Sequence, residues 1–131
     1  MKRAIFIGCV LLIAAFWLAT TLRGQRPQTN DLKDFMRAKL LHSQKLVEGL
    51  TTENYEMIAK HAQDLSLLCE DEQWQVFRTS DYIARSKEFR RATDALTEAG
   101  RAKNLDAASL GYVDVTLKCV ECHKYLRTIR K

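Results

Sequence analysis

The sequence has few of the residues that interrupt helices. Its 131 residues include one proline, Pro27, and five glycines. Folds built from many tight turns need such residues, so their scarcity disfavours a β-sandwich or a β-barrel and favours long helices. No segment alternates apolar and polar residues as a strand would, and no internal repeat is found. The sequence therefore predicts an all-α fold.

Acidic residues are missing from the first 24 positions. This segment holds three basic residues, Lys2, Arg3 and Arg23, which contribute to a formal net charge of +5 for the chain. The rest of the chain has 18 basic and 16 acidic residues, which leaves a net charge of only +2. An excess this small does not indicate a nucleic-acid partner.

The same N-terminal segment contains a long uncharged run. Lys2 and Arg3 precede residues 4–22, which are 19 residues without a charge. This length spans a bilayer core of ~30 Å at ~1.5 Å per residue, and it exceeds the ~7–15 residues usual in a cleaved signal peptide. A signal peptide and a transmembrane anchor both remain open for residues 1–24. Either one predicts export, with a periplasmic domain that residues 4–22 could hold at the membrane.

Residues 25–30 are polar, contain the proline and predict a linker, so the folded domain is expected over residues 31–131. Within it, apolar residues recur every three to four positions in four stretches, over residues 31–50, 52–69, 81–103 and 105–128. Asn30, Ser80 and Asn104 are candidate N-caps. Residues 70–80 are less regular and are expected to form a loop. Four helices with short connections predict an antiparallel four-helix bundle. The four stripes expected to face its core are Leu32, Met36, Leu40, Val47 and Leu50; Tyr55, Ile58, Ala62, Leu65 and Cys69; Tyr82, Ser86, Phe89, Ala92, Leu96 and Ala99; and Ala108, Tyr112, Val115, Cys119, Cys122 and Leu126.

The strongest chemical signal is Cys119-Val120-Glu121-Cys122-His123 near the end of the last stretch. On a helix, positions i and i+3 share a face, so both thiols point the same way. Each thiol can form a thioether with one vinyl group of a haem, and His123 can then donate a ring nitrogen to the iron. This pattern is the recognised sign of c-type haem attachment. It predicts one covalently bound haem c.

Other uses of the two cysteines are disfavoured. A structural zinc site needs four ligands, and the remaining donors, Cys69, His42 and His61, are scattered without paired spacing. A thioredoxin-like pair opens a helix after a strand, whereas this pair lies deep within a predicted helix. Regular helix geometry leaves little room for a disulfide between positions i and i+3. We expect His42 and His61 to be surface histidines and Cys69 to be a small buried hydrophobic residue.

A haem motif near the C-terminal end of an all-helical domain resembles the class II cytochromes c. This is the group of cytochrome c′ and cytochrome c-556, related in fold to cytochrome b562. The likeness covers about Asp31 to Arg127 and is strongest over residues 118–127, where a basic residue, Arg127, follows His123 by four positions. The resemblance implies a single haem c in a helical bundle and redox partner proteins, with homodimerisation as a further expectation. It also implies that Arg127 lies near the haem, although a solvated helix end remains open.

The resemblance extends to the start of the domain, where residues 31–37 include Met36, a candidate second iron ligand. In low-spin members of the group a methionine at about this place binds the iron, which implies this role for Met36. A shifted register would place Leu40 or Leu41 over the haem instead. The residue chemistry agrees, because a thioether is a soft donor that suits haem iron, but methionine is also common core filler. Arg37 is within reach of a haem propionate or is solvated.

The expected function is one-electron transfer, because two protein ligands on the iron leave no site for a substrate. The alternative is a five-coordinate protein, ligated by His123 alone, that binds a small gas such as nitric oxide. We expect no enzymatic activity, since the sequence shows no histidine–arginine pair or carboxylate cluster suited to peroxidase chemistry.

Overall fold

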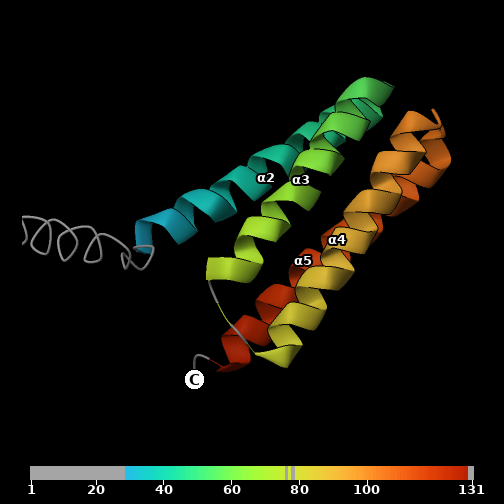
Figure 1. Cartoon of the computed structure of the whole chain (residues 1–131). Coiled ribbons are helices and arrows are strands. Elements are labelled where there is room, and N and C mark those ends of the chain that lie inside the picture. The colour runs from blue at the N-terminus through green and yellow to red at the C-terminus, as the bar shows by residue number, and fades with distance from the viewer. Residues whose placement is uncertain (1–28, 76, 78, 130–131) are drawn as a thin grey trace, which may run out of the picture.

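The computed structural model describes residues 29–75, 77 and 79–129. This part of the chain holds four α-helices and no strand: α2 (Thr29–Thr51), α3 (Tyr55–Gln75), α4 (Ser80–Arg101) and α5 (Leu105–Ile129). Each helix runs antiparallel to the next, and Figure 1 shows the α2–α3 hairpin beside the α4–α5 hairpin. The prediction of a four-helix bundle is confirmed.

The signal or anchor expected at residues 1–24 lies outside the described residues. Helix α2 already includes Thr29 and Asn30, the last two residues of the expected linker; the rest of that segment lies outside the described residues. For the same reason Asn30 is not the N-cap of this helix. None of the helices formed by the described residues is long and apolar enough to cross a membrane.

Two other helix ends differ from the sequence expectation. Helix α3 continues to Gln75, so most of the loop expected at residues 70–80 is helical. Thr79, and not Ser80, caps α4, because its hydroxyl accepts a hydrogen bond from the Tyr82 backbone N–H at 3.3 Å. The cap expected at Asn104 is confirmed: its Oδ1 accepts from the Ala107 N–H at 3.0 Å.

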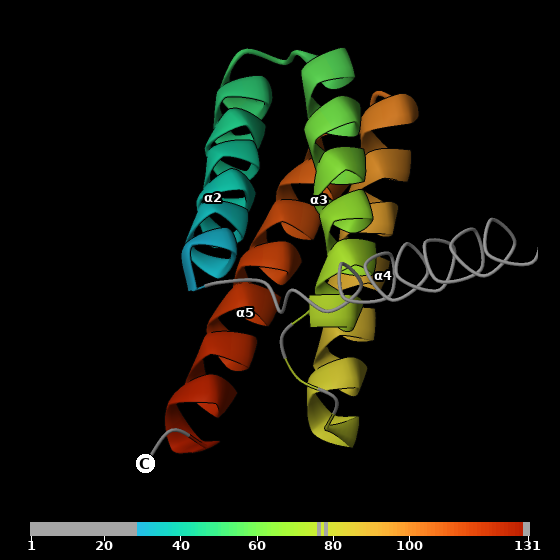
Figure 2. The same ribbon diagram turned by 60° about the vertical axis from the view of Figure 1, so that its left-hand side comes forward.

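Two turns of the same design connect the helices within each hairpin, at residues 52–54 and 102–104. Each has a residue with positive φ, Glu53 at 52° and Lys103 at 53°, followed by an asparagine that caps the next helix. The backbone N–H of that asparagine, Asn54 or Asn104, donates back to the carbonyl of the preceding helix at 2.8 or 3.1 Å. These bonds satisfy helix-terminal carbonyls in the manner of a Schellman cap. Both turns lie at one end of the bundle, the turn end (Figures 1 and 2).

The opposite end of the bundle holds the connection between α3 and α4 and the last residues of α5 (Figure 2). Residues 119–123 lie towards this end, which we call the motif end. Helix α2 packs on α3, α3 on α4 and α4 on α5, but α2 and α5 make few contacts with each other. The bundle is therefore closed on three sides and loosely packed on the fourth.

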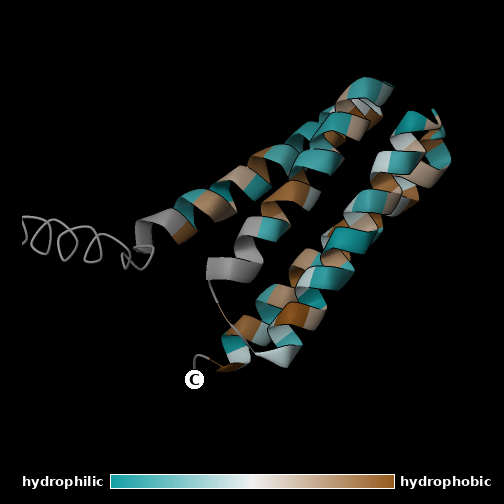
Figure 3. Ribbon diagram, viewed as in Figure 1, coloured by the Kyte–Doolittle hydropathy of each residue, from teal (hydrophilic) through white to brown (hydrophobic). Residues whose placement is uncertain are grey.

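The core confirms most of the expected stripes. Figure 3 shows hydrophobic and hydrophilic residues following one another along each helix, as amphipathic helices require. Two buried threonines, Thr93 and Thr97, donate their hydroxyl hydrogen to carbonyls of their own helix at 2.8 and 2.9 Å, so they leave no donor unsatisfied. The buried hydrophobic core consists of Leu46, Ile58, Ala62, Leu65, Cys69, Tyr82, Phe89, Ala92, Leu96, Ala108 and Val115.

The stripe expected on α2 is wrong in part. Leu46 is fully buried, whereas Val47 is 43% exposed and Leu40 is 58% exposed. Two stripes with alternating steps of three and four share Met36, Ser43 and Leu50 and differ only in the flank that completes them. Because α2 packs mainly on α3, the flank that carries Leu46 is buried and the other is left exposed.

Candidate functional site

A cavity of about 360 Å³ lies at the motif end, where α2 and α5 stand apart. All four described helices contribute to its wall. Cavities of about 300–1,000 Å³ are the usual size of ligand sites in proteins. The wall includes Met36 and Leu40 from α2 and Cys119, Cys122 and His123 from α5. The structure thus brings together five residues that the sequence singled out.

The motif lies within α5, which continues to Ile129. Cys119 and Cys122 are half-buried and one helical turn apart, so both thiols meet the cavity from one side, as the spacing predicts. Between them, Glu121 is exposed and accepts a hydrogen bond from the Lys118 ammonium at 3.3 Å. This hydrogen bond raises the pKa of Lys118 above its ordinary value. Glu121 is therefore at the surface, while Cys119 and Cys122 on either side of it line the cavity.

The wall behind the two cysteines is mainly apolar. Leu65, Phe89 and Val115 are buried core residues that also line the cavity, and Tyr112 packs against the same core. The Lys39 ammonium lies 5.0 Å from the ring centroid of Phe35 and 4.9 Å from that of Phe89, both cation–π distances. The cavity thus combines an apolar interior with a positive charge at its wall.

Two polar atoms at this wall have no hydrogen-bond partner among the described residues. They are Nε of Arg85 and Oγ of Ser86, both buried. Buried polar atoms are nearly always hydrogen-bonded, so an unsatisfied pair beside a cavity indicates a place for a polar group of a ligand. Haem c is a planar, largely apolar group with two carboxylates, attached through two thiols. The residues present fit such a group.

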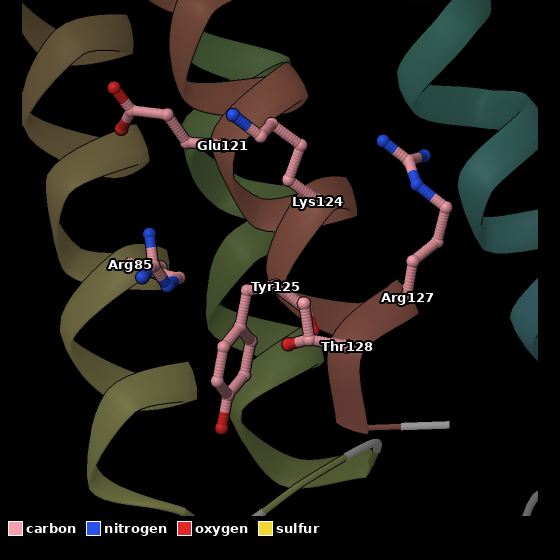
Figure 4. A pocket seen from close by; sticks show the side chains of 6 residues that line it. All are labelled: Arg85, Glu121, Lys124, Tyr125, Arg127 and Thr128. Carbon is pink, nitrogen blue, oxygen red and sulfur yellow. The ribbon is translucent and has the colours of Figure 1, made fainter. Parts of the chain in front are cut away.

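Arg127 and Arg37, expected near the haem, do not line this cavity. Arg127 belongs to a shallower neighbouring pocket with Arg85, Lys124 and Tyr125. Figure 4 shows Arg127 on the other side of α5 from Arg85 and directed away from it. The guanidinium carbon of Arg85 lies 5.0 Å from the ring centroid of Tyr125. Arg37 is exposed. Of Arg37, Arg85 and Arg127, the structure places only Arg85 at the cavity.

Two histidines expected at the surface form a cluster instead. His42 of α2 and His61 of α3 are half-buried, and their Nδ1 atoms lie 2.9 Å apart. Oδ2 of Asp64 lies 3.4 Å from the first and 3.7 Å from the second. Burial lowers the pKa of His61 below its ordinary value of 6.5; the nearby His42 and Lys60 act in the same direction, and Asp64 opposes them. The sequence did not predict that these two histidines lie in contact.

Sequence reasoning did not assign several of the cavity residues to the site, among them Ser86 and Phe89 of α4. Ser86 and Phe89 were expected in the core stripe of α4, and the same spacing places them at the cavity. Arg85 and Lys39 carried no signal, because long cationic side chains beside an apolar stripe are common on helices with no ligand. Cys69 is fully buried, as expected of a small hydrophobic residue.

Comparisons of the chain with protein-family models, with curated proteins and with solved structures give no match.

Proposed function

We propose that this chain is a monohaem c-type cytochrome that carries single electrons, with haem c bound through thioethers to Cys119 and Cys122. The observation that carries the proposal is the shared cavity. The two cysteines and His123 line it from α5, and Met36 lines it from α2. A recognised attachment motif thus opens onto an apolar space of ligand size, with a second soft donor contributed by another helix.

The chain's own residues have distinct roles in this proposal. When haem is bound, His123 would supply a ring nitrogen to the iron and Met36 would supply a thioether sulfur. When bound, haem c supplies an iron that gains and loses one electron. Histidine–methionine ligation favours a raised reduction potential. Leu65, Phe89 and Val115 limit the access of water, and Arg85 and Lys39 supply positive charge opposite in sign to haem carboxylates.

Visible spectra of the oxidised and reduced protein test this ligand set. The wild-type protein is expected to be low-spin, with a methionine-to-iron charge-transfer band in the oxidised state. Met36→Ala should lose the band and become high-spin. The matched control is Leu40→Ala, which changes the same wall but removes no donor and should keep the band. A wild-type protein that is high-spin and binds carbon monoxide would instead favour the five-coordinate, gas-binding alternative.

The proposed setting is the periplasm, with residues 4–22 holding the domain at the membrane. A haem attached outside the cytoplasm requires export, and the uncharged run after Lys2 and Arg3 is suited to it. Fractionation of cells that produce the full chain should place it in the membrane fraction facing the periplasm. Deletion of residues 1–24 should leave the polypeptide in the cytoplasm without covalent haem. The proposed partners are redox proteins.

A further inference from the structure

The second cluster of potential ligands lies between α2 and α3, outside the cavity wall. His42, His61 and Asp64 present three donor atoms to one another, with separations of 2.9, 3.4 and 3.7 Å. The sequence contains three histidines, and two of them are in this cluster. All three side chains are between 18% and 28% exposed, so a small ion can reach them from solvent.

The triangle formed by these atoms has the dimensions of a metal site. Zn²⁺ binds imidazole nitrogen at ~2.0–2.1 Å in a tetrahedron, which separates neighbouring ligand atoms by about 3.4 Å. The three observed separations lie on both sides of this value, so small side-chain rotations suffice to bind an ion. Two imidazoles and one carboxylate form a donor set that suits borderline divalent ions of the first transition row.

We propose that His42, His61 and Asp64 bind one divalent transition-metal ion, such as Zn²⁺, and thereby link α2 to α3. Solvent supplies the remaining ligand. The proposal is independent of the haem, since no residue is shared between the two sites. It concerns a site with three protein ligands and is therefore expected to bind more weakly than a structural site with four.

The protons and charges around the cluster are compatible with binding. In the metal-free protein one Nδ1 donates to the other, so one ring carries its proton on Nδ1. That ring must carry the proton on Nε2 before its Nδ1 can bind the ion, which is a change of tautomer without net charge. The Lys60 ammonium competes for Asp64, since its Nζ lies 2.7 Å from Oδ2. A bound cation would have to displace this ammonium, which is 64% exposed and can turn to solvent.

The consequence of binding concerns α2. This helix carries Met36, and within the described chain it packs on α3 and only weakly on α5. An ion held by His42 from α2 and by two residues from α3 adds a link where α2 has its main support. An ion that binds only the folded state stabilises that state, and the stabilisation grows with the logarithm of the ion concentration once the site is saturated.

Calorimetric titration of Zn²⁺ into chelator-treated, full-length, haem-loaded protein tests the proposal. We expect one ion per chain with a dissociation constant in the micromolar range or below, and a melting temperature that rises with Zn²⁺ concentration. His42→Ala and His61→Ala should each weaken binding at least about tenfold, and Asp64→Asn should weaken it less. Glu56→Gln removes an exposed carboxylate of α3 outside the cluster and should leave binding unchanged.

Lys60→Met provides a test that does not depend on the fold tolerating a change at a half-buried residue. It removes an exposed competing cation, so Zn²⁺ should bind more tightly than to the wild type. Equal affinity in Lys60→Met and wild type would overturn the assignment of Asp64. Absence of saturable binding in the micromolar range would overturn the proposal. Binding that persists undiminished when both histidines are replaced would also overturn it, because the ion would then be held by residues outside the cluster.

Discussion

At the turn end of the bundle the helices approach closely, and at the motif end they leave a cavity. A Cβ atom placed on Gly100 of α4 would lie 2.9 Å from the backbone nitrogen of Ala59 in α3, and one on Gly49 would lie 3.0 Å from the Ile58 side chain. At the motif end, by contrast, Arg85 and Ser86 face a cavity with unsatisfied polar atoms. The same four helices thus form a closed core at one end and a ligand-sized opening at the other.

The difference follows from the residues that face inward. Small residues at the turn end let helix backbones meet, so that van der Waals contacts are dense there. The inward positions of the motif end carry Met36, Cys119 and Cys122, and its wall includes Ser86. These side chains leave a space between α2 and α5. The core at the turn end can stabilise the bundle without a ligand. The motif end can then hold a permanent cofactor, as the proposed function requires.

The largest expected effect on stability is at the closed end. Leu46→Ala deletes a fully buried side chain and should lower the free energy of unfolding by about 2–5 kcal/mol. Its neighbour on α2, Val47, is 43% exposed, so Val47→Ala should change stability by less than about 0.5 kcal/mol. Chemical denaturation of both variants measures the difference. Equal losses would contradict the burial of the α3-facing flank of α2.

A glycine substitution tests the close approach directly. Gly100→Ala should destabilise the protein by about 1–3 kcal/mol, since the new methyl group meets backbone that cannot move easily. Gly111→Ala is the matched control, because a Cβ there would make an ordinary contact of 3.4 Å with Leu96. In a helix interior this replacement should be neutral or stabilising by up to about 1 kcal/mol. If both variants behave alike, Gly100 does not approach the α3 backbone as closely as described.

Two buried serines provide a smaller contrast between the α3–α4 contact and the cavity wall. Ser66 donates to Asp94 Oδ1 at 2.6 Å, so Ser66→Ala should cost about 0.5–1.5 kcal/mol. Ser86 lacks such a partner within the described residues, and Ser86→Ala should be neutral or slightly stabilising in haem-free protein. Denaturation curves of the two variants compare them. A clear loss of stability in haem-free Ser86→Ala would show that its hydroxyl is satisfied after all.

The smallest expected effect is the pH dependence contributed by His61. Its pKa is lowered in the folded protein, so the folded state binds this proton less readily than the unfolded chain. Its contribution to stability is complete above the unfolded value of about 6.5 and declines as the pH falls through the folded value. In chelator-treated protein, His61→Gln should flatten the pH dependence of stability in this window, and Glu56→Gln should not. An unchanged slope in His61→Gln would contradict the lowered pKa.

Much of the fold was predictable because it depends on local patterns. The four stretches of period 3.6, the cap at Asn104 and the core faces of α3 and α4 all follow from residues close together in the chain. The period alone did not decide which stripe of α2 is buried, since two stripes share Met36, Ser43 and Leu50 and differ in the flank that completes them. Which flank is buried depends on the neighbouring helix, and the sequence of α2 alone does not contain that information.

The residues of the candidate site likewise fall into those predictable from local patterns and those that depend on how the helices pack. Cys119, Cys122 and His123 were found from their spacing, and Met36 and Leu40 from the resemblance, and all five line one cavity. Arg85 was missed, and Arg127, expected near the haem or at a solvated helix end, does not line the cavity, because the reach of a long side chain depends on the rotation of its helix. The contact between His42 and His61 joins residues 19 positions apart on two helices. Only the relative rotation of α2 and α3 brings them together.

The most direct test of the account is the mass and spectrum of the chain produced in a host that attaches haem c. The account predicts that the denatured wild-type protein keeps one haem, seen as a mass increase of one haem per chain and a haem absorption band on the polypeptide. Cys119→Ser/Cys122→Ser should lose both signals while its helical content remains. A wild-type chain without covalent haem, produced beside a c-type cytochrome that receives its own, would contradict the account.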